Sequence, residues 1–214
     1  MDRSKAKQRM MATLRREISD ERVLAVMEAV RREAFVPPEL ASQAYDNKPL
    51  PIGEGQTISQ PLMVGIMLQA LSVQPDDVVL DVGTGSGYQA ALLGRLAARV
   101  VTVERIPALA DRARRVLRSE RCWNVEVRTH RSASGLPDEA FDGIVVGAAA
   151  PAAPTTLIDR LAIGGRLVIP VGTPVEQRLA RVVRTEDGTS VQWLGPCRFV
   201  PLIGEEGWSE DFSA

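Results

Sequence analysis

The sequence predicts an α/β protein with a doubly wound, mainly parallel β-sheet, a helical extension before it and an antiparallel hairpin near its end. Short β-branched runs alternate with helical segments of ten or more residues, which is typical of parallel strands joined by crossover helices. The runs "VVL", "IVV" and "LVI" are hydrophobic without alternation, so we expect central strands covered on both faces. Asp187-Gly188 separates two strand-like runs and predicts the hairpin.

Length and composition indicate one domain. The chain has 214 residues, of which 45% are hydrophobic, and no linker-like run divides it. We expect a single domain over residues 1–214. Residues 1–72 would form the helical extension and a loop, and residues 73–214 the α/β core.

Charge and cysteine usage argue against several classes of protein. Lys and Arg total 26 against 27 for Asp and Glu, which leaves no positive surplus for binding nucleic acid. The basic opening "MDRSKAKQRMMATLRR" lacks an apolar run, so we expect a solvated helical arm and no membrane contact. Cys122 and Cys197 form no CxxC motif, which argues against a disulfide framework or zinc site and fits a reducing, cytoplasmic setting.

Two helices are expected before the strands. In "SDERVLAVMEAV", apolar side chains recur at helical spacing and Asp20 is a plausible N-cap. The second helix begins at Pro61, a residue tolerated at the first helical position. The residues expected on the apolar faces are Val23, Val26, Met27 and Val30 in the first helix, and Met63, Ile66, Met67 and Ala70 in the second.

The segment "PLPIGEGQTISQP", residues 49–61, predicts a rigid polar loop before the second helix. Its three prolines fix backbone angles, and Gly53 and Gly55 would let another molecule come close to the backbone. Thr57 and Ser59 contribute hydroxyls. The strands that follow are expected at "VVLDVG", "RVVTVE", "NVEVRT", "FDGIVVG" and "GRLVIPVG".

A glycine-rich turn follows the first of these strands, over residues 81–88, and leads into the predicted helix "YQAALLGRLAA". Open parallel sheets bind ligands beyond the carboxyl ends of their strands, and such a turn brings backbone amides close to a ligand. The dinucleotide pattern G-x-G-x-x-G fails because Tyr88 stands at its last position. Asp81 would repel a pyrophosphate but suits an ammonium group, and Glu104 suits ribose hydroxyls. These features favour S-adenosylmethionine.

Other interpretations of this turn and of the histidine are weaker. The turn could be a plain strand-to-helix connection, with Glu104 a carboxylate at a helix start. No lysine precedes Ser or Thr, which excludes a Walker loop, and Ser86 lacks the flanking glycines of a nucleophile elbow. His130 is the only histidine, so no metal site is expected.

Taken together, these segments resemble the protein-L-isoaspartate O-methyltransferase family, from about Ser19 to Trp208. The matching runs are "ERVLAVMEAV", "FVPPEL", "AYDNKPLPIGEGQTISQP", "LDVGTGSGYQAALL", "VERIPALA", "FDGIVVGAAAP", "GGRLVIPVG" and "RFVPLIGEEGW". The glycine turn alone would indicate only the wider class of S-adenosylmethionine-dependent methyltransferases.

The resemblance implies a Rossmann-like sheet of seven strands and a repair enzyme. Such an enzyme methylates the α-carboxylate of L-isoaspartyl residues in damaged proteins and peptides, with S-adenosylmethionine as cofactor, S-adenosylhomocysteine as product and no metal. We expect a monomer that binds neither nucleic acid nor membrane. Ser59 would be catalytic. The cofactor would contact Thr57, Ile58, Asp81, Gly83, Thr84, Gly85, Glu104, Arg105, Ser132 and Gln177.

The sequence departs from the family pattern at three places. After His130, where the family has Gly-Asp-Gly, this chain has Arg-Ser-Ala, so Ser132 would make a weaker contact to adenine than an aspartate. Gly147 stands where a threonine is usual, which would change the pocket shape. Arg31 replaces a proline in the extension.

Three alternatives stay open. Ser59 could instead bond to the amide of Leu62 at the helix start. The enzyme could methylate the carboxylate of a specific modified peptide precursor, as the departures at Ser132 and Gly147 suggest. The chain could also be a binding protein that retains the fold without turnover.

Overall fold

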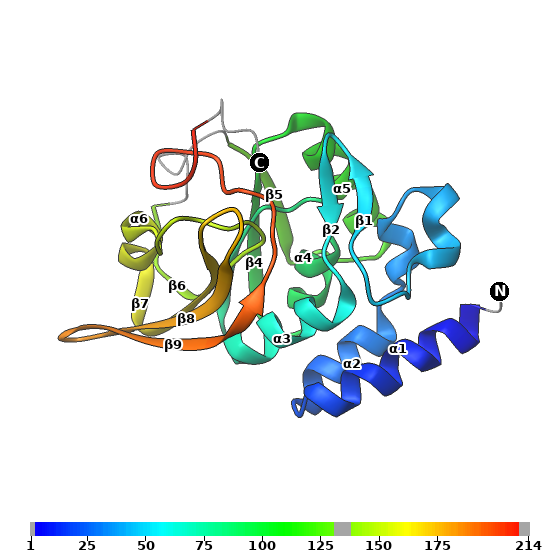
Figure 1. Cartoon of the computed structure of the whole chain (residues 1–214), viewed down its shortest axis with the longest axis horizontal. Helices are drawn as coiled ribbons and strands as arrows, with labels where there is room; N and C mark the ends of the chain where they lie inside the picture. Colours follow the sequence, from blue (N-terminus) through cyan, green and yellow to red (C-terminus); the bar gives the residue numbers. More distant parts are fainter. Residues whose placement is uncertain (1–2, 131–137, 210–214) are drawn as a thin grey trace.

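The computed structural model describes residues 3–130 and 138–209, and its centre is a seven-stranded sheet (Figure 1). The strand order is β5-β4-β3-β6-β7-β8-β9. The strands from β5 to β7 pair in parallel, whereas β8 and β9 are antiparallel. Their bounds are β3 Val78–Val82, β4 Arg99–Glu104, β5 Val125–Thr129, β6 Phe141–Val146, β7 Leu161–Gly172, β8 Gln177–Thr185 and β9 Gly188–Cys197. The predicted fold class is confirmed.

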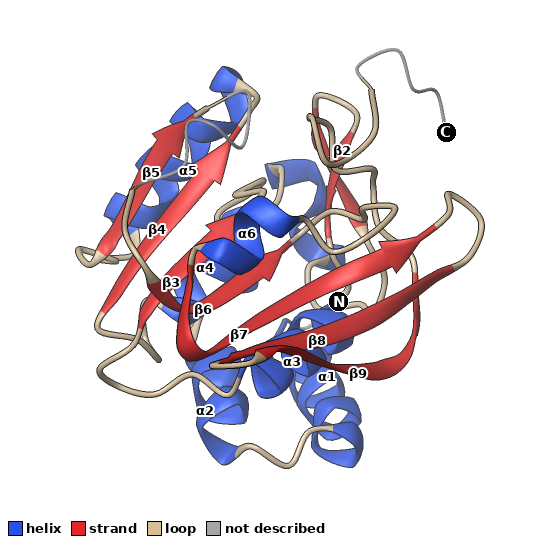
Figure 2. Cartoon of the chain, turned by 90° about the vertical axis from the view of Figure 1, so that its left-hand side faces the viewer, coloured by secondary structure: helices blue, strands red, loops and turns tan. Residues whose placement is uncertain are grey.

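Alternate side chains of the strands point to opposite faces of the sheet. Val79 belongs to one buried cluster and the next residue, Leu80, to the other. Helices α4 (Tyr88–Leu93) and α5 (Pro107–Ser119) cover the first face, and α6 (Thr155–Asp159) covers the second (Figure 2). Helix α5 fits the expected length, but α4 and α6, with 6 and 5 residues, are shorter than expected.

Helix α4 ends before Gly94, which is its C-cap residue. The chain turns at Gly94, where a side chain would meet Val125 at 2.7 Å. The C-terminal hairpin also differs slightly from expectation. Thr185 pairs with Gly188, so the two turn residues are Glu186 and Asp187, one position earlier than predicted.

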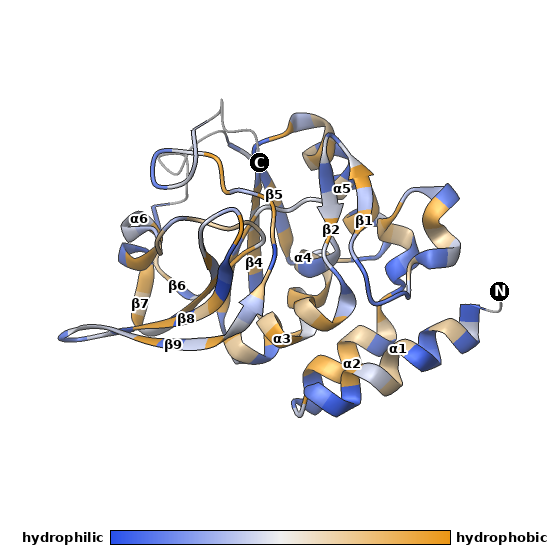
Figure 3. Ribbon diagram, in the orientation of Figure 1, coloured by the Kyte–Doolittle hydropathy of each residue, from blue (hydrophilic) through white to orange (hydrophobic). Residues whose placement is uncertain are grey.

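The N-terminal extension packs on the core, and the expectation of a solvated arm was wrong for one face of its first helix. Helix α1 (Arg3–Glu17) buries Met10, Met11 and Leu14, and it contacts α2 (Glu21–Ala29) and α3 (Pro61–Leu71). Burial of those apolar side chains outweighs the basic character of the helix. Figure 3 shows α2 as largely apolar.

Helix α3 begins at Pro61, as predicted, but of the four residues expected on its buried face only Met67 is fully buried. The fully buried positions are Val64, Met67, Leu68 and Leu71, whereas Met63, Ile66 and Ala70 are only partly buried. The reason is that α3 contacts α1 and α2 as well as strands β6 and β7. Asp20 caps α2 as predicted by accepting from the amides of Arg22 and Val23.

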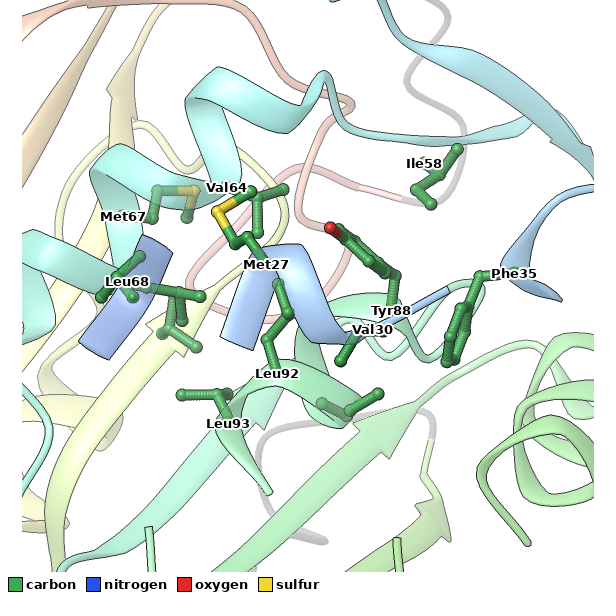
Figure 4. Packing of buried hydrophobic residues seen from close by; sticks show 14 of the residues in the cluster. Met27, Val30, Phe35, Ile58, Val64, Met67, Leu68, Tyr88, Leu92 and Leu93 are labelled. Carbon is green, nitrogen blue, oxygen red and sulfur yellow. The ribbon is translucent and has the colours of Figure 1, made fainter. Parts of the chain in front are cut away.

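The predicted polar loop is a two-stranded antiparallel hairpin, so that expectation was wrong. It follows two short 3-10 helices, Arg32–Phe35 and Pro38–Gln43, and consists of β1 (Leu50–Gly53) and β2 (Gln56–Ile58). Leu50, Ile52 and Ile58 are buried. Figure 4 shows Ile58 within the buried apolar cluster that also holds Tyr88 and Phe35.

The two glycines of this hairpin serve its turn. Gly53 and Gly55 have φ values of 89° and 68°, and Glu54 between them has 53°. Glycine adopts this left-handed region without strain, so these residues reverse the chain. Gly53 also lies close to Arg112, whose guanidinium donates to the carbonyl of Ile52.

Candidate active site

Two adjoining cavities lie at the carboxyl ends of the central strands. The larger, about 550 Å³, is lined by residues that include Ser59, Met63, Gln177, Arg198 and Trp208. The smaller, about 140 Å³, is lined by residues that include Gly83, Gly85, Glu104, Ile106 and His130. Both are lined by Thr57, Gly147, Val200 and Pro201. A ligand in one cavity can therefore meet a ligand in the other.

The glycine turn is held by Glu104, at the end of β4. The amide of Gly85 donates to one carboxylate oxygen at 2.8 Å, and the amide of Ile106 donates to the other at 2.9 Å. A carboxylate has about four acceptor positions, so Glu104 keeps capacity for further donors. Gly83 and Gly85, with φ values of 94° and 53°, supply the turn that brings the backbone to the cavity.

Asp81 lies beneath the turn and lines neither cavity. Its carboxylate is fully buried and accepts from the Thr102 hydroxyl and from Nε2 of Gln89, both at 2.8 Å. Burial raises the pKa of Asp81 to about 6, the two hydrogen bonds oppose that rise, and the charge of Glu104 adds to it. The Thr84 hydroxyl extends this network to Thr102 at 2.6 Å. In this structure Asp81 and Thr84 support the turn from below.

Ser59 lines the larger cavity, in the short segment between β2 and α3. Within the described parts of the chain its hydroxyl makes no hydrogen bond. The amide of Leu62 donates instead to Oδ1 of Asn47 at 3.1 Å, so Asn47 serves the helix start. The alternative role of Ser59 as a cap is wrong for this structure. The Ser59 carbonyl accepts from Nη2 of Arg32 at 2.6 Å.

Sequence reasoning missed both Asn47 and Arg32. Asn47 is a residue type that often caps helices, but it lies 15 positions before the amide that it binds. Arg32 is one of 26 basic residues, and its burial depends wholly on tertiary structure. No local spacing indicates either residue.

Gln177 begins β8 and braces the wall of the larger cavity. Its Oε1 accepts from the amide of Phe199 at 2.7 Å, and its Nε2 donates to the carbonyl of the same residue at 3.2 Å.

Of the other predicted cofactor contacts, Thr57 lines both cavities and exposed Arg105 lines the smaller one. Ile58 is buried in the core, and Ser132 lies outside the described residues.

Gly147, the departure at the end of β6, lies where the two cavities meet. A side chain added there would meet the carbonyl oxygen of Gly83 at 3.2 Å. That contact is tighter than most, so a larger residue would require the glycine turn to shift. Glycine at this position therefore matches the close approach of the two strand ends.

The segment 200–207 crosses the smaller cavity and is fastened at Glu206, a feature that the sequence did not reveal. The Glu206 carboxylate accepts from the amide and hydroxyl of Thr155, at 2.7 and 2.6 Å, and from the amide of Thr156 at 3.1 Å. We call residues 200–207 the strap.

The residues around the smaller cavity fit an adenosyl ligand. Glu104 can accept from ribose hydroxyls, Gly83 and Gly85 leave the backbone uncovered, and apolar Ile106 and Leu157 offer a surface for a base. Over residues 3–130 and 138–209, no group of three His, Cys, Asp or Glu side chains could hold a metal ion. The helices of these same ranges are too short or too polar to span a membrane.

Comparisons with known proteins agree with this geometry. A family model described as protein-L-isoaspartate(D-aspartate) O-methyltransferase matches residues 4–207. A protein-L-isoaspartate O-methyltransferase of Methanoculleus marisnigri is 51% identical over 92% of this chain and 90% of its own length. A protein of the same name from Syntrophotalea carbinolica is 50% identical over 99% of each chain.

One solved structure adds a ligand to these similarities. It is a Plasmodium falciparum protein described as a protein-L-isoaspartate O-methyltransferase, in complex with S-adenosyl-L-homocysteine. It superposes with a TM-score of 0.80 at 25% identity and covers 91% of this chain and 96% of its own.

Proposed function

Because the chain belongs to the protein-L-isoaspartate(D-aspartate) O-methyltransferase family, we propose that it methylates the free α-carboxylate of L-isoaspartyl residues in damaged proteins and peptides. We propose S-adenosylmethionine as the methyl donor and S-adenosylhomocysteine as the product. The observation that carries the proposal is the contact between two cavities. Ser59 lines one cavity, the glycine turn and Glu104 line the other, and the two cavities share Thr57 and Gly147.

The reaction depends more on positioning the acceptor carboxylate against the methyl group than on a general base. An isoaspartyl α-carboxylate titrates near pH 3 to 4 (about the value of other α-carboxyl groups) and is already ionised at neutral pH. The bound cofactor would supply an electrophilic methyl group on a sulfonium. Ser59 lies free to donate a hydrogen bond that aims the carboxylate without taking up a proton. This role explains a hydroxyl that the helix start does not use.

Removal of water would favour the transfer. An anion and a cation become two neutral products, so an apolar surrounding makes the separated charges of the reactants less favourable than the products. Met63, Pro196, Phe199 and Trp208 around the larger cavity provide such a surrounding. Glu104 would hold the ribose hydroxyls in the smaller cavity, and Asp81 would fix the turn from below.

The remaining features complete the proposal. We propose a cytoplasmic monomer whose partners are isoaspartyl proteins and peptides, with no nucleic acid or membrane partner. Peptide specificity would be broad, because damage arises in many sequence contexts and recognition must rest on backbone and carboxylate.

The test is a methyl-transfer assay with purified protein, S-adenosylmethionine and a pair of peptides that differ only in isoaspartyl or aspartyl linkage. We expect S-adenosylhomocysteine only with the isoaspartyl peptide. No product, under conditions where a known repair enzyme is active, would refute the proposal. A preference for one modified precursor would indicate a different acceptor, and failure to bind S-adenosylhomocysteine in calorimetry would indicate a protein without turnover.

A further inference from the structure

Arg32 is a fully buried cation at the start of the first 3-10 helix. Its exposed fraction is 0%, and among the described residues it forms no ion pair with a carboxylate. Its Nε donates to the carbonyl of Ala44 at 2.8 Å and its Nη2 to the carbonyl of Ser59 at 2.6 Å. The guanidinium carbon lies 4.7 Å from the ring centroid of Tyr88.

Burial of the Arg32 guanidinium destabilises the folded state, because the charge loses its hydration. A guanidinium does not give up its proton in proteins, so the charge persists in the interior. Two carbonyl dipoles and the face of an aromatic ring compensate for it in part. Within the described residues, however, neither Nη1 of Arg32 nor the hydroxyl of Tyr88 makes a hydrogen bond of good geometry, although the two side chains interact electrostatically. An apolar residue would avoid these costs, which suggests that Arg32 has a role beyond stability.

The contacts of Arg32 connect the two halves of the site. Ser59 lies in the segment that lines the larger cavity. Tyr88 is the first residue of α4 and directly follows the glycine turn that borders the smaller cavity. The ring of Tyr88 also packs edge-on against Phe35, with centroids 5.6 Å apart, so it is fixed in place. One planar side chain therefore links the backbone of Ser59 to the end of the glycine turn.

We propose that Arg32 is a positioning residue that sets the place of the Ser59 hydroxyl relative to the glycine turn. This inference rests on the proposed methyl transfer. It assigns to Arg32 an effect on the rate of that transfer through the position of Ser59. The guanidinium fork reaches two carbonyls at once and stacks on the ring, whereas a lysine ammonium is a single point of charge. Arg32→Lys keeps the charge and loses that geometry.

The kinetic test compares Arg32→Lys with the wild type, at a temperature where circular dichroism shows both to be folded. Small misplacements of reacting groups slow reactions by up to about 100-fold, so we expect kcat for an isoaspartyl peptide to fall about 10- to 100-fold. We expect the Kd of S-adenosylhomocysteine, measured by calorimetry, to stay within about 3-fold, because the smaller cavity is intact.

Arg166→Lys is the matched control. Arg166 donates to the carbonyls of Leu71 and Ser72 at 2.9 and 3.0 Å, at the opposite end of α3 from Ser59. It also pairs with Asp77 at 2.5 Å. We expect this variant to lose stability and to keep the wild-type kcat. Equal losses of kcat in the two variants, or wild-type kcat in Arg32→Lys, would overturn the inference.

Hydrogen exchange provides a readout that does not depend on activity. In Arg32→Lys we expect faster amide exchange over residues 56–60 than in the wild type or in Arg166→Lys, because the Ser59 carbonyl is released. Unchanged exchange would contradict the inference even if the wild type proved inactive on isoaspartyl peptides. An inactive wild type with faster exchange in Arg32→Lys would instead refute the proposed function alone.

A second variant tests the positioning role of Arg32 if Arg32→Lys does not fold. Tyr88→Leu keeps Arg32 and removes the ring on which it stacks. We expect a smaller fall in kcat, about 3- to 10-fold, with S-adenosylhomocysteine binding again within about 3-fold. Wild-type kcat in a folded Tyr88→Leu variant would overturn the inference.

Discussion

Two polar residues near the start of α3, Asn47 and Ser59, have different roles. Asn47 accepts from the amide of Leu62, while Ser59 lines the larger cavity. Loss of a capping side chain costs about 0.5–2 kcal/mol, and Asn47 is exposed, so we expect Asn47→Ala to lower the free energy of unfolding by about 1 kcal/mol. Ser59→Ala should change it by no more than about 0.5 kcal/mol.

Urea denaturation of both variants measures the two changes in unfolding free energy. The methyl-transfer assay then compares the activities of the same two variants. Ser59→Ala should transfer methyl groups more slowly and bind S-adenosylhomocysteine as tightly as the wild type. Asn47→Ala tests whether a loss of stability alone reduces activity. Wild-type activity in Ser59→Ala would remove this residue from the catalytic role.

Asp81 should make stability depend on pH in a way that its asparagine variant does not. Its folded pKa of about 6 lies above the ordinary value of 3.8, so between these values the native state holds more protons than the unfolded state. Its contribution is then complete below about pH 4 and is lost as the pH rises through 6. The difference in unfolding free energy, wild type minus Asp81→Asn, should fall between pH 4 and 7 by at most about 3 kcal/mol. Urea titrations at several pH values measure it, and a constant difference would contradict the assignment.

At the scale of elements, the strap depends on a contact between Glu206 and the start of α6. Burial opposes ionisation of this carboxylate, but its hydrogen bonds from Thr155 and Thr156 outweigh that effect and lower the pKa of Glu206. The contact should therefore hold at neutral pH and weaken as the pH falls through that lowered value. Glu206→Gln removes the charge and leaves one acceptor oxygen.

We expect Glu206→Gln to weaken S-adenosylhomocysteine binding by about 5-fold, since about 1 kcal/mol is a reasonable loss for partly exposed hydrogen bonds to a charge. Calorimetry at pH 7.5 measures this effect. Glu186→Gln, in the turn between β8 and β9, is the control and should bind as the wild type does. Identical affinities in all three proteins would show that the strap does not control the smaller cavity.

The sequence predicted those elements whose signals are local. Asp20 and Pro61 mark helix starts by their own chemistry, and the strands are short β-branched runs. The hairpin of β1 and β2 was hidden because prolines 49 and 51 suggest a loop. Pro51 is exposed on a two-stranded sheet, where a missing amide proton is tolerated.

For the whole molecule, the candidate site could be predicted only in part. The glycine turn and Glu104 follow from their order along the chain, and Ser59 followed from a resemblance. Arg32 could not be foreseen because its partners, at 44, 59 and 88, meet only when the extension, the hairpin segment and α4 pack together. Burial of Asp81 and the bracing role of Gln177 likewise depend on side chains brought from other elements.

That same packing predicts that the extension and the α/β core unfold together. One buried cluster runs from Leu14 of α1 through Leu68 of α3 to Val145 of β6. Leu14→Ala removes a side chain that is 1% exposed, so it should lower the free energy of unfolding by about 2–5 kcal/mol. Far-UV circular dichroism reports mainly the helices, whereas the three tryptophans, 123, 193 and 208, all lie outside the extension. In urea, both signals should shift to the same lower midpoint. A variant that loses helical signal first, with tryptophan fluorescence unchanged, would mean that residues 1–72 unfold as a separate unit.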